Sequence, residues 1–181
     1  MGRLDMLQWC RAQIGTKETP DGSNNIVYNT HYYGRTINDS AYAWCVVFLW
    51  DGFRQTGNSR AFYGGGKTAS CSAVEYWARV NGYKIPVADL QPGDLVIYNL
   101  DGAGSPYDHI GIVEEVSPSK LVTIEGNVAN AVRRVDRTAD RGKISVAISP
   151  PYVETPANII KSKLEALRAQ LDQIIKEVLQ T

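Results

Sequence analysis

The thiolate form of cysteine is a strong nucleophile, and the sequence has three cysteines, Cys10, Cys45 and Cys71. Cys45 lies near the start of an apolar run, 43–56, whose length and glycine stop predict a buried helix. The N-terminus of a helix carries partial positive charge and free N–H groups, so it lowers the pKa of a thiol and can bind an oxyanion. Cys45 is therefore the candidate nucleophile. Any one cysteine can instead be a small buried apolar residue.

A nucleophilic cysteine needs a base, and the sequence offers two histidines. His31 lies in the aromatic segment 28–33 and is expected to be a surface or packing residue. His109 begins a predicted strand, 109–116, after a glycine-rich turn, where a side chain can meet another element. Gly111 shares the face of His109 and leaves room beside the imidazole. His109 is therefore the candidate base.

An imidazole that acts as a base is oriented by a group on its second nitrogen. The predicted strand 121–125 and the residues after it place Thr123, Glu125 and Asn127 on one face. The turn between this strand and the strand of His109 is short enough for the two to pair as a hairpin. Either Glu125 or Asn127 can then face the imidazole, and the sequence leaves the choice open.

The elements that must position these residues fall into two halves of the chain. The first half predicts a long ordered loop over 19–40 and helices over 3–14, 43–56 and 68–81. The second half predicts strands over 95–98, 109–116, 121–125, 132–135 and 144–148. This order is typical of an α+β fold, with N-terminal helices packed on a largely antiparallel sheet of about five strands, plus a C-terminal helix.

We expect three segments along the chain: a globular domain over 1–152, a proline-containing linker over 153–157 and an amphipathic helix over 158–181. The apolar residues of the last segment alternate spacings of four and three, as in a coiled-coil heptad; they are Ile160, Leu164, Leu167, Leu171, Ile174 and Val178. This helix is expected to be a linker or to form a homo-oligomer. The alternatives are a helix that packs back on the domain and a stalk.

The composition excludes several classes of function. The 19 basic and 19 acidic residues cancel, so no nucleic-acid partner is expected. No apolar run reaches the roughly 18 residues of a membrane span, so no membrane insertion is expected. The N-terminus does not resemble a secretory leader, which predicts a cytoplasmic location. With three cysteines, two histidines and no Cys-x-x-Cys, neither a disulfide framework nor a zinc site is expected.

Two segments resemble cofactor-binding motifs, but each lacks a residue that the motif requires. Residues 61–68 end like a phosphate-binding loop but begin with alanine where that loop needs glycine. Residues 21–25 offer oxygen ligands at alternate positions, but the acidic residue that an EF-hand requires falls on Tyr32. We therefore expect that no cofactor is required. A looser calcium site built from 21–25 is the alternative.

Four short motifs together resemble the CHAP domain, the cysteine, histidine-dependent amidohydrolase/peptidase domain of phage endolysins and bacterial autolysins. They are Trp44-Cys45-Val-Val-Phe48-x-Trp50, Pro92-Gly-Asp-Leu-Val96, Asp108-His-Ile-Gly-Ile-Val113 and Ile124-Glu-Gly-Asn127. Each motif is weak alone, but all four occur in the order of the family. The resemblance covers residues 3–152.

The resemblance implies a papain-like fold and a peptidoglycan hydrolase that cleaves an amide bond of the bacterial cell wall. The bond is that of an N-acetylmuramoyl-L-alanine amidase or of a peptide endopeptidase. The nucleophile is then Cys45 and the base His109, with Glu125 or Asn127 as the orienting group. Some members hold calcium in an Asp-rich loop before the cysteine, and this chain has no Asp-x-Asp there. A phage endolysin of this kind stays in the host cytoplasm until lysis.

Aromatic side chains near the cysteine are expected to line the substrate groove: Tyr33, Tyr42 and Trp44. For each of them, packing within the loop is the alternative. Three other functions stay open. They are an NlpC/P60-type peptidase, whose third catalytic residue is usually another histidine or a polar group, a non-catalytic cell-wall-binding module, and an interaction protein built around 158–181.

Overall fold

The computed structural model describes residues 2–154 and 156–179. Its helices are α1 (Arg3–Gln13), α2 (Val27–Tyr33), α3 (Cys45–Gln55), α4 (Cys71–Val80) and α5 (Pro156–Leu179). Its strands are β1 (Lys84–Ile85), β2 (Leu95–Tyr98), β3 (His109–Ser117), β4 (Lys120–Val128), β5 (Ala131–Asp136) and β6 (Ile144–Ile148). Short 3-10 turns lie at Ser59–Ala61, Tyr63–Gly65, Val87–Asp89 and Arg141–Lys143.

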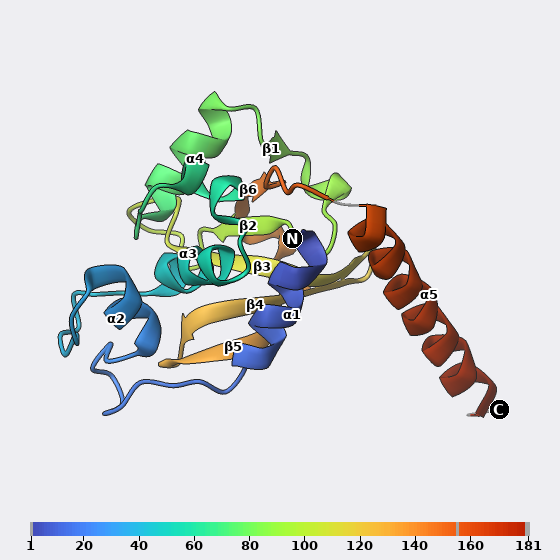
Figure 1. The fold of residues 1–181 in the computed structure, drawn as a ribbon, viewed down its shortest axis with the longest axis horizontal. Coiled ribbons are helices and arrows are strands. Elements are labelled where there is room, and N and C mark those ends of the chain that lie inside the picture. The colour runs from blue at the N-terminus through green and yellow to red at the C-terminus, as the bar shows by residue number, and fades with distance from the viewer. Residues whose placement is uncertain (1, 155, 180–181) are drawn as a thin grey trace.

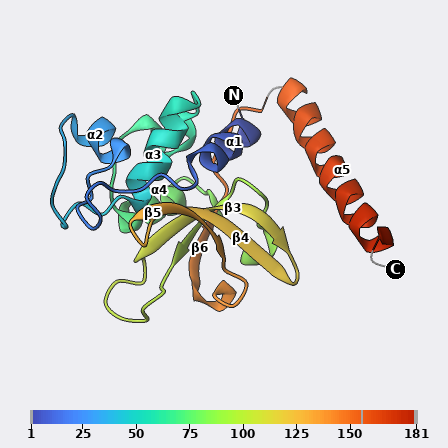
Figure 2. The same ribbon diagram turned by 90° about the horizontal axis from the view of Figure 1, so that it is seen from below.

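The strands form one antiparallel sheet in the order β1-β6-β2-β3-β4-β5 (Figure 1). Figure 2 shows α1, α2 and α3 gathered on one face of this sheet. Apolar side chains of the helices and of alternate strand positions form the main core between them. The predicted α+β fold is therefore confirmed, with six strands in place of about five.

Helix α3 packs directly on the sheet, and this packing buries nearly all of its residues. Every residue from Cys45 to Phe53 is buried, and α3 contacts β3 and β4. The close approach depends on Gly126 of β4, where an added Cβ would lie 2.6 Å from the Cβ of Phe48. The same packing sets the N-terminus of α3 against the strands that carry His109 and Glu125.

Strands β3 and β4 form the predicted hairpin, with Ile112 paired with Ile124. This register brings Gly111 beside Glu125, and an added Cβ at Gly111 would lie 2.7 Å from the Cγ of Glu125. The space that Gly111 leaves is therefore used by the carboxylate side chain that approaches the imidazole of His109.

The predicted loop over 19–40 contains a helix that the sequence did not indicate. Helix α2 has seven residues and ends at Gly34, whose φ is 70°. Its Tyr28 is buried and meets Trp9 of α1 and Phe48 of α3 edge to face. These contacts stabilise a helix that is too short to form by itself or to show a clear period. The sixth strand, β1, has only two residues and is missed for the same reason.

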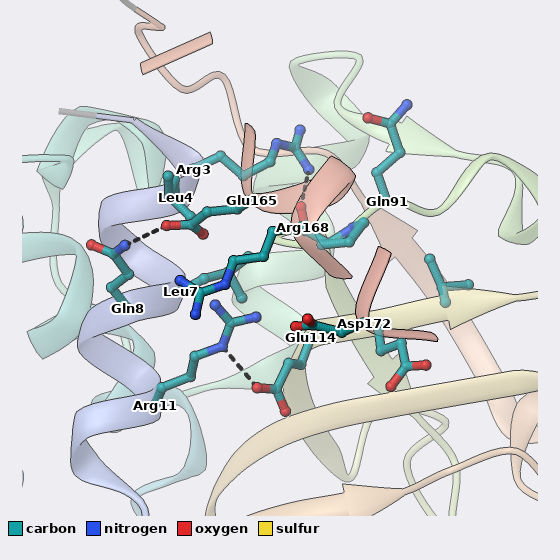
Figure 3. A pocket seen from close by; sticks show the side chains of 13 residues that line it. Arg3, Leu4, Leu7, Gln8, Arg11, Gln91, Glu114, Glu165, Arg168 and Asp172 are labelled. Carbon is teal, nitrogen blue, oxygen red and sulfur yellow. Dashed lines mark hydrogen bonds and ion pairs between the residues drawn. The ribbon is translucent and has the colours of Figure 1, made fainter. Parts of the chain in front are cut away.

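Helix α5 projects away from the sheet (Figures 1 and 2). It begins at Pro156, two residues before the predicted start of the amphipathic helix. A cavity of about 640 Å³ lies between α1, α5 and β3 (Figure 3). None of the described helices is both long and apolar enough to span a membrane. The division into a domain, a linker and a helix stays a prediction.

Candidate active site

Cys45 is the first residue of α3 and follows the N-cap residue Trp44. The first hydrogen bond of the helix runs from the N–H of Phe48 to the carbonyl of Trp44. The N–H groups of Cys45, Val46 and Val47 therefore have no partner within the helix, and that of Val46 donates to the sulfur of Cys45. The predicted position of the thiol, at the positive end of a buried helix, is the observed one.

His109 lies at the start of β3, between Glu125 and Cys45. Its Nε2 lies 2.8 Å from Oε2 of Glu125. This contact leaves Nδ1 for Cys45, whose thiol is near enough to raise the pKa of His109. The three side chains come from α3, β3 and β4, and they form one connected row.

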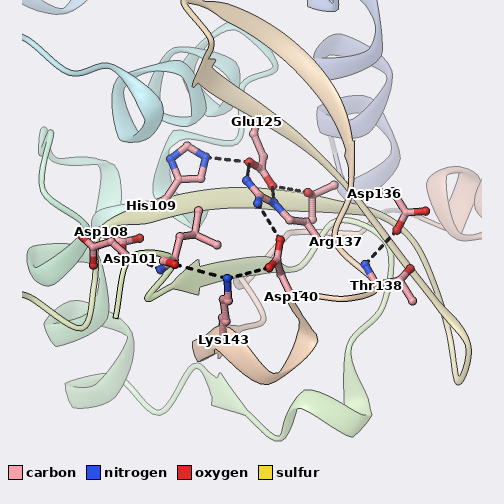
Figure 4. Close-up of polar contacts among 11 residues, drawn as sticks. Asp101, Asp108, His109, Glu125, Asp136, Arg137, Thr138, Asp140 and Lys143 are labelled. Carbon is pink, nitrogen blue, oxygen red and sulfur yellow. Dashed lines mark hydrogen bonds and ion pairs between the residues drawn. The ribbon is translucent and has the colours of Figure 1, made fainter. Parts of the chain in front are cut away.

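Glu125 is fully buried and is held from the side opposite His109. Arg137 donates to both of its carboxylate oxygens, at 2.9 Å from Nε and at 2.6 Å from a terminal nitrogen. Thr123 donates its hydroxyl to the same carboxylate. Arg137 is itself paired with Asp140 at 3.0 Å, and Figure 4 shows how Glu125 lies between His109 and Arg137.

The charges along this row follow from burial and hydrogen bonding. Burial raises the pKa of Glu125, but the hydrogen bonds from Arg137 and His109 outweigh it and lower the pKa to about 2. Burial alone would lower the pKa of His109, but its hydrogen bonds with Cys45 and Glu125 raise it to about 9. The row therefore favours an imidazolium ion between two negative charges.

Cys71 is a member of the site that the sequence analysis did not identify. It begins α4 as Cys45 begins α3, and its hydrogen bond is the largest cause that lowers the pKa of Cys45 well below that of a free thiol. His109 lowers the pKa of Cys45 further, against the effect of burial. The proximity of Cys45, together with burial, raises the pKa of Cys71. A second cysteine at a predicted helix start is the signal that could have indicated it.

The structure answers which group contacts the imidazole. Glu125 hydrogen bonds to His109, whereas Asn127, the other candidate, has a left-handed φ of 62°. The pairing of β4 with β5 breaks register between Glu125 and Val128. The strict alternation that placed Asn127 on the face of Glu125 therefore does not continue to residue 127.

The expectation that Trp44 lines a substrate groove is wrong. Its side chain is fully buried, and its indole Nε1–H donates to Oε1 of Glu18 at 2.7 Å. The other oxygen of Glu18 accepts the N–H of Asn24 at 2.7 Å. Trp44 therefore ties the start of α3 to the N-terminal loop and has no surface with which to touch a ligand.

Tyr33 and Tyr42 keep accessible surface. Both are half-buried, and their rings meet edge to face at 4.9 Å between centroids. Arg35 donates to the hydroxyl of Tyr42 at 3.0 Å. Their predicted contact with a substrate stays a prediction.

The loop residues 21–25 do not gather their oxygens around one point. Oδ1 of Asp21 accepts a hydrogen bond from Asn130, Ser23 donates to the carbonyl of Pro20, and the amide of Asn25 donates to the carbonyl of Thr19. Among the described residues no group of three or more His, Cys, Asp or Glu side chains is placed to hold a metal ion. No catalytic step below uses a metal ion.

The family model of the CHAP domain matches residues 37–127 of the 181. This range includes Cys45, His109, Glu125 and Asn127, and it ends before Arg137. No curated protein matches the chain significantly.

Two solved structures have a similar fold. "The crystal structure of Ly7917" matches with a TM-score of 0.52 and 20% identity, and "The crystal structure of Ly7917 with the hydrolyzing product of MDP" matches with a TM-score of 0.51 and 19% identity. Each match covers 83% of this chain and 63% of that chain. The chain therefore spans less than two thirds of the Ly7917 chain, and at these identities the likeness concerns the fold alone.

Proposed function

This chain belongs to the CHAP-domain family, and from that membership and the geometry of its site we propose that it is a peptidoglycan hydrolase. The reaction is cleavage of an amide bond of the bacterial cell wall by a cysteine nucleophile. One observation carries the proposal: His109 is hydrogen bonded to the buried Glu125 at 2.8 Å, and Cys45, at the N-terminus of α3, is near enough to His109 to raise its pKa.

In the first step the thiolate of Cys45 attacks the carbonyl carbon of the amide. A C–S bond forms, and the π electrons of the carbonyl move to its oxygen. The N–H of Cys45, which has no partner within α3, is placed to donate to this oxyanion. Removal of one such donor typically costs about 3 kcal/mol of transition-state stabilisation.

In the second step the imidazolium of His109 protonates the leaving nitrogen, the C–N bond breaks, and a thioester remains on Cys45. Water then gives a proton to the neutral imidazole and attacks the thioester carbonyl. The C–S bond breaks, and the thiolate and imidazolium are restored. Glu125 accepts the Nε2–H of His109, so the ring keeps its other nitrogen toward the sulfur.

Two bonds of peptidoglycan suit this chemistry: the N-acetylmuramoyl–L-alanine amide, and a peptide bond of the stem or cross-bridge. In this proposal Tyr33 and Tyr42 supply aromatic surface for the glycan or the peptide. Because the second Ly7917 structure is one with the hydrolyzing product of MDP, MDP is a useful small substrate to test on this chain.

The test is digestion of purified peptidoglycans of several chemotypes, and of MDP, with mass spectrometry of the released fragments. The protein and its Cys45→Ala variant are compared, with Cys10→Ala as the control for loss of a buried thiol. We expect new fragments from the protein and from Cys10→Ala but not from Cys45→Ala. New N-acetylmuramic acid termini identify an amidase, and new peptide termini identify an endopeptidase.

The opposite result favours the rival function. If no chemotype yields Cys45-dependent fragments while the protein still sediments with insoluble peptidoglycan, the chain is a cell-wall-binding module. The proposed setting is a phage endolysin, made in the host cytoplasm and acting on the wall at lysis. Hydrolysis of isolated walls by the purified chain is the minimum requirement for that setting.

A further inference from the structure

The apolar seam of α5 faces solvent. Ile160, Leu164, Leu167, Leu171 and Ile174 expose between 54% and 61% of their surface. These residues follow the alternating spacing of four and three that defines the a and d positions of a heptad. An amphipathic helix that packs on its own domain buries this stripe, so the orientation of α5 needs another explanation.

The polar side of α5 faces the domain instead. Glu165 accepts a hydrogen bond from the amide of Gln8 at 2.9 Å, and Lys161 donates to the oxygen of the same amide at 3.2 Å. Farther along the helix, Arg168 and Asp172 line the cavity of about 640 Å³ (Figure 3).

The opposite wall of that cavity carries both apolar side chains, among them Leu4 and Leu7 of α1, and charged ones. There Arg11 of α1 is paired with Glu114 of β3 at 2.8 Å. The hydrogen bonds between α5 and the domain therefore come from the polar side of the helix, and the exposed seam is left available to a different partner.

No other described helix can cover the seam within one chain. Helices α1 to α4 have between 7 and 11 residues, whereas α5 has 24. Heptad side chains pack as knobs into holes formed by a second helix with the same repeat. The helix that is certain to carry this repeat is α5 of another copy.

The area is sufficient for such a pair. Each aliphatic side chain of the seam buries on the order of 100 Å² when it is covered. Five such side chains from each of two helices bury about 1,000 Å² in total, the minimum expected of a specific interface. Because about three heptads are close to the shortest stable length, the association is expected to be weak and dependent on concentration.

We propose that α5 is a dimerisation helix whose partner is α5 of a second copy of this chain. The dimer forms through the solvent-facing seam, while the polar side of each helix stays against its own domain. This assignment is independent of the proposed hydrolysis. If the hydrolysis is also correct, the dimer holds two active sites on one polymeric substrate and gains avidity from doing so.

The test is the mass of the full chain in solution, measured by light scattering over a roughly hundredfold range of concentration. The monomer has a mass of 20.0 kDa. We expect the mass to rise toward twice that value as concentration increases. A chain that stays monomeric throughout, or that forms a trimer, overturns the proposal.

A pair of variants tests the surface. Leu164→Glu with Leu171→Glu places charges on the seam. Ile159→Glu with Leu179→Glu places the same charges on exposed apolar residues of α5 outside the seam, with 44% and 79% of their surface exposed. Circular dichroism verifies that the domain stays folded in both.

We expect the seam variant to be monomeric where the protein is dimeric, with dimerisation at least roughly 100-fold weaker. The control variant is expected to dimerise as the protein does. Dimerisation of the seam variant, or equal loss in both variants, overturns the proposal. Hydrolysis of MDP is measured separately, so failure of the proposed function does not affect this result.

Discussion

The charge on His109 depends on a carboxylate that water does not reach. Glu125 is fully buried, and an isolated buried carboxylate would take up a proton. The two hydrogen bonds from Arg137 keep it ionised. Arg137 is thus linked to the thiol through two intermediate side chains, although the family model ends ten residues before it.

The first prediction at this scale concerns pH. The pKa of His109, raised to about 9, predicts that kcat/KM falls on the basic side near pH 9, where the imidazolium is lost and cannot protonate the leaving amine. The free energy of unfolding should also fall as pH rises. The stabilising contribution of the charged His109 ring is complete below pH 6.5, the ordinary pKa of histidine, and it is lost as pH rises through about 9. A pH–rate profile whose basic limb lies near 6.5 would contradict the ion pair.

The second prediction concerns Arg137. Arg137→Ala leaves the buried charge of Glu125 without its partner, so we expect kcat to fall about 10- to 100-fold, or roughly 1.4 to 2.7 kcal/mol. The free energy of unfolding is expected to fall by about 3 kcal/mol, measured by denaturation. Because Glu125 loses the hydrogen bonds that lower its pKa, the acid limb of the pH profile should move to higher pH, and Arg137→Lys should restore part of this change.

The control for Arg137 is Arg134→Ala. Arg134 lies on β5 and pairs with Glu114 at the surface. Its loss is expected to cost at most about 1 kcal/mol of stability and to leave the pH profile unchanged. Equal pH profiles for Arg137→Ala and Arg134→Ala would show that Arg137 does not act on the catalytic histidine through Glu125.

The third prediction concerns Cys71. In Cys71→Ala the thiolate of Cys45 loses a hydrogen bond, so the pKa of Cys45 should rise and its alkylation at acidic pH should slow. The measurement is the pH dependence of Cys45 alkylation, followed by peptide mass spectrometry. Cys10→Ala, which removes a fully buried core thiol, is the control. The same acid limb in Cys71→Ala and in the control would count against the role of Cys71.

At the scale of elements, the sequence predicts the site where local pattern decides the structure. A short apolar run, 95–98, and the alternating residues 144–148 predict strands at the bounds of β2 and β6. A long apolar run places Cys45 near the start of α3. The hairpin follows from two adjacent strands and a short turn. These features need no knowledge of distant residues.

The remaining features depend on tertiary contacts that no local pattern encodes. Arg137 follows β5 in an irregular segment and meets Glu125 only after the sheet forms. Trp44 has an aromatic side chain of the kind that lines binding grooves, yet the N-terminal loop covers it through a hydrogen bond to Glu18. Asn127 leaves the predicted face because its backbone turns left-handed.

The fourth prediction belongs to the packing of α3 on the sheet. Gly126→Ala would place a Cβ 2.6 Å from that of Phe48, so we expect a loss of about 1 to 3 kcal/mol in the free energy of unfolding. Gly142→Ala is the control because nothing lies within 4 Å of its added Cβ. Its effect should stay within about 0.5 kcal/mol. Equal stability of the two variants in urea denaturation would show that α3 does not need this close approach.

At the scale of the whole molecule, α5 is built differently from the rest of the described chain. The helices and the sheet bury a common core and place one thiol beside one imidazole. Helix α5 shares little of that core, contacts the domain through polar groups and keeps its apolar seam outward. A loss of dimerisation is therefore expected to leave the turnover of small substrates by each domain unchanged.

The most direct test of the central claim is the rate at which the protein and Cys45→Ala, both shown to be folded by circular dichroism, release soluble fragments from purified peptidoglycan. We expect Cys45→Ala to be slower by about 10⁴-fold or more, because removal of the nucleophile abolishes the thioester route. A folded Cys45→Ala protein that releases fragments at the rate of the unchanged chain would contradict it.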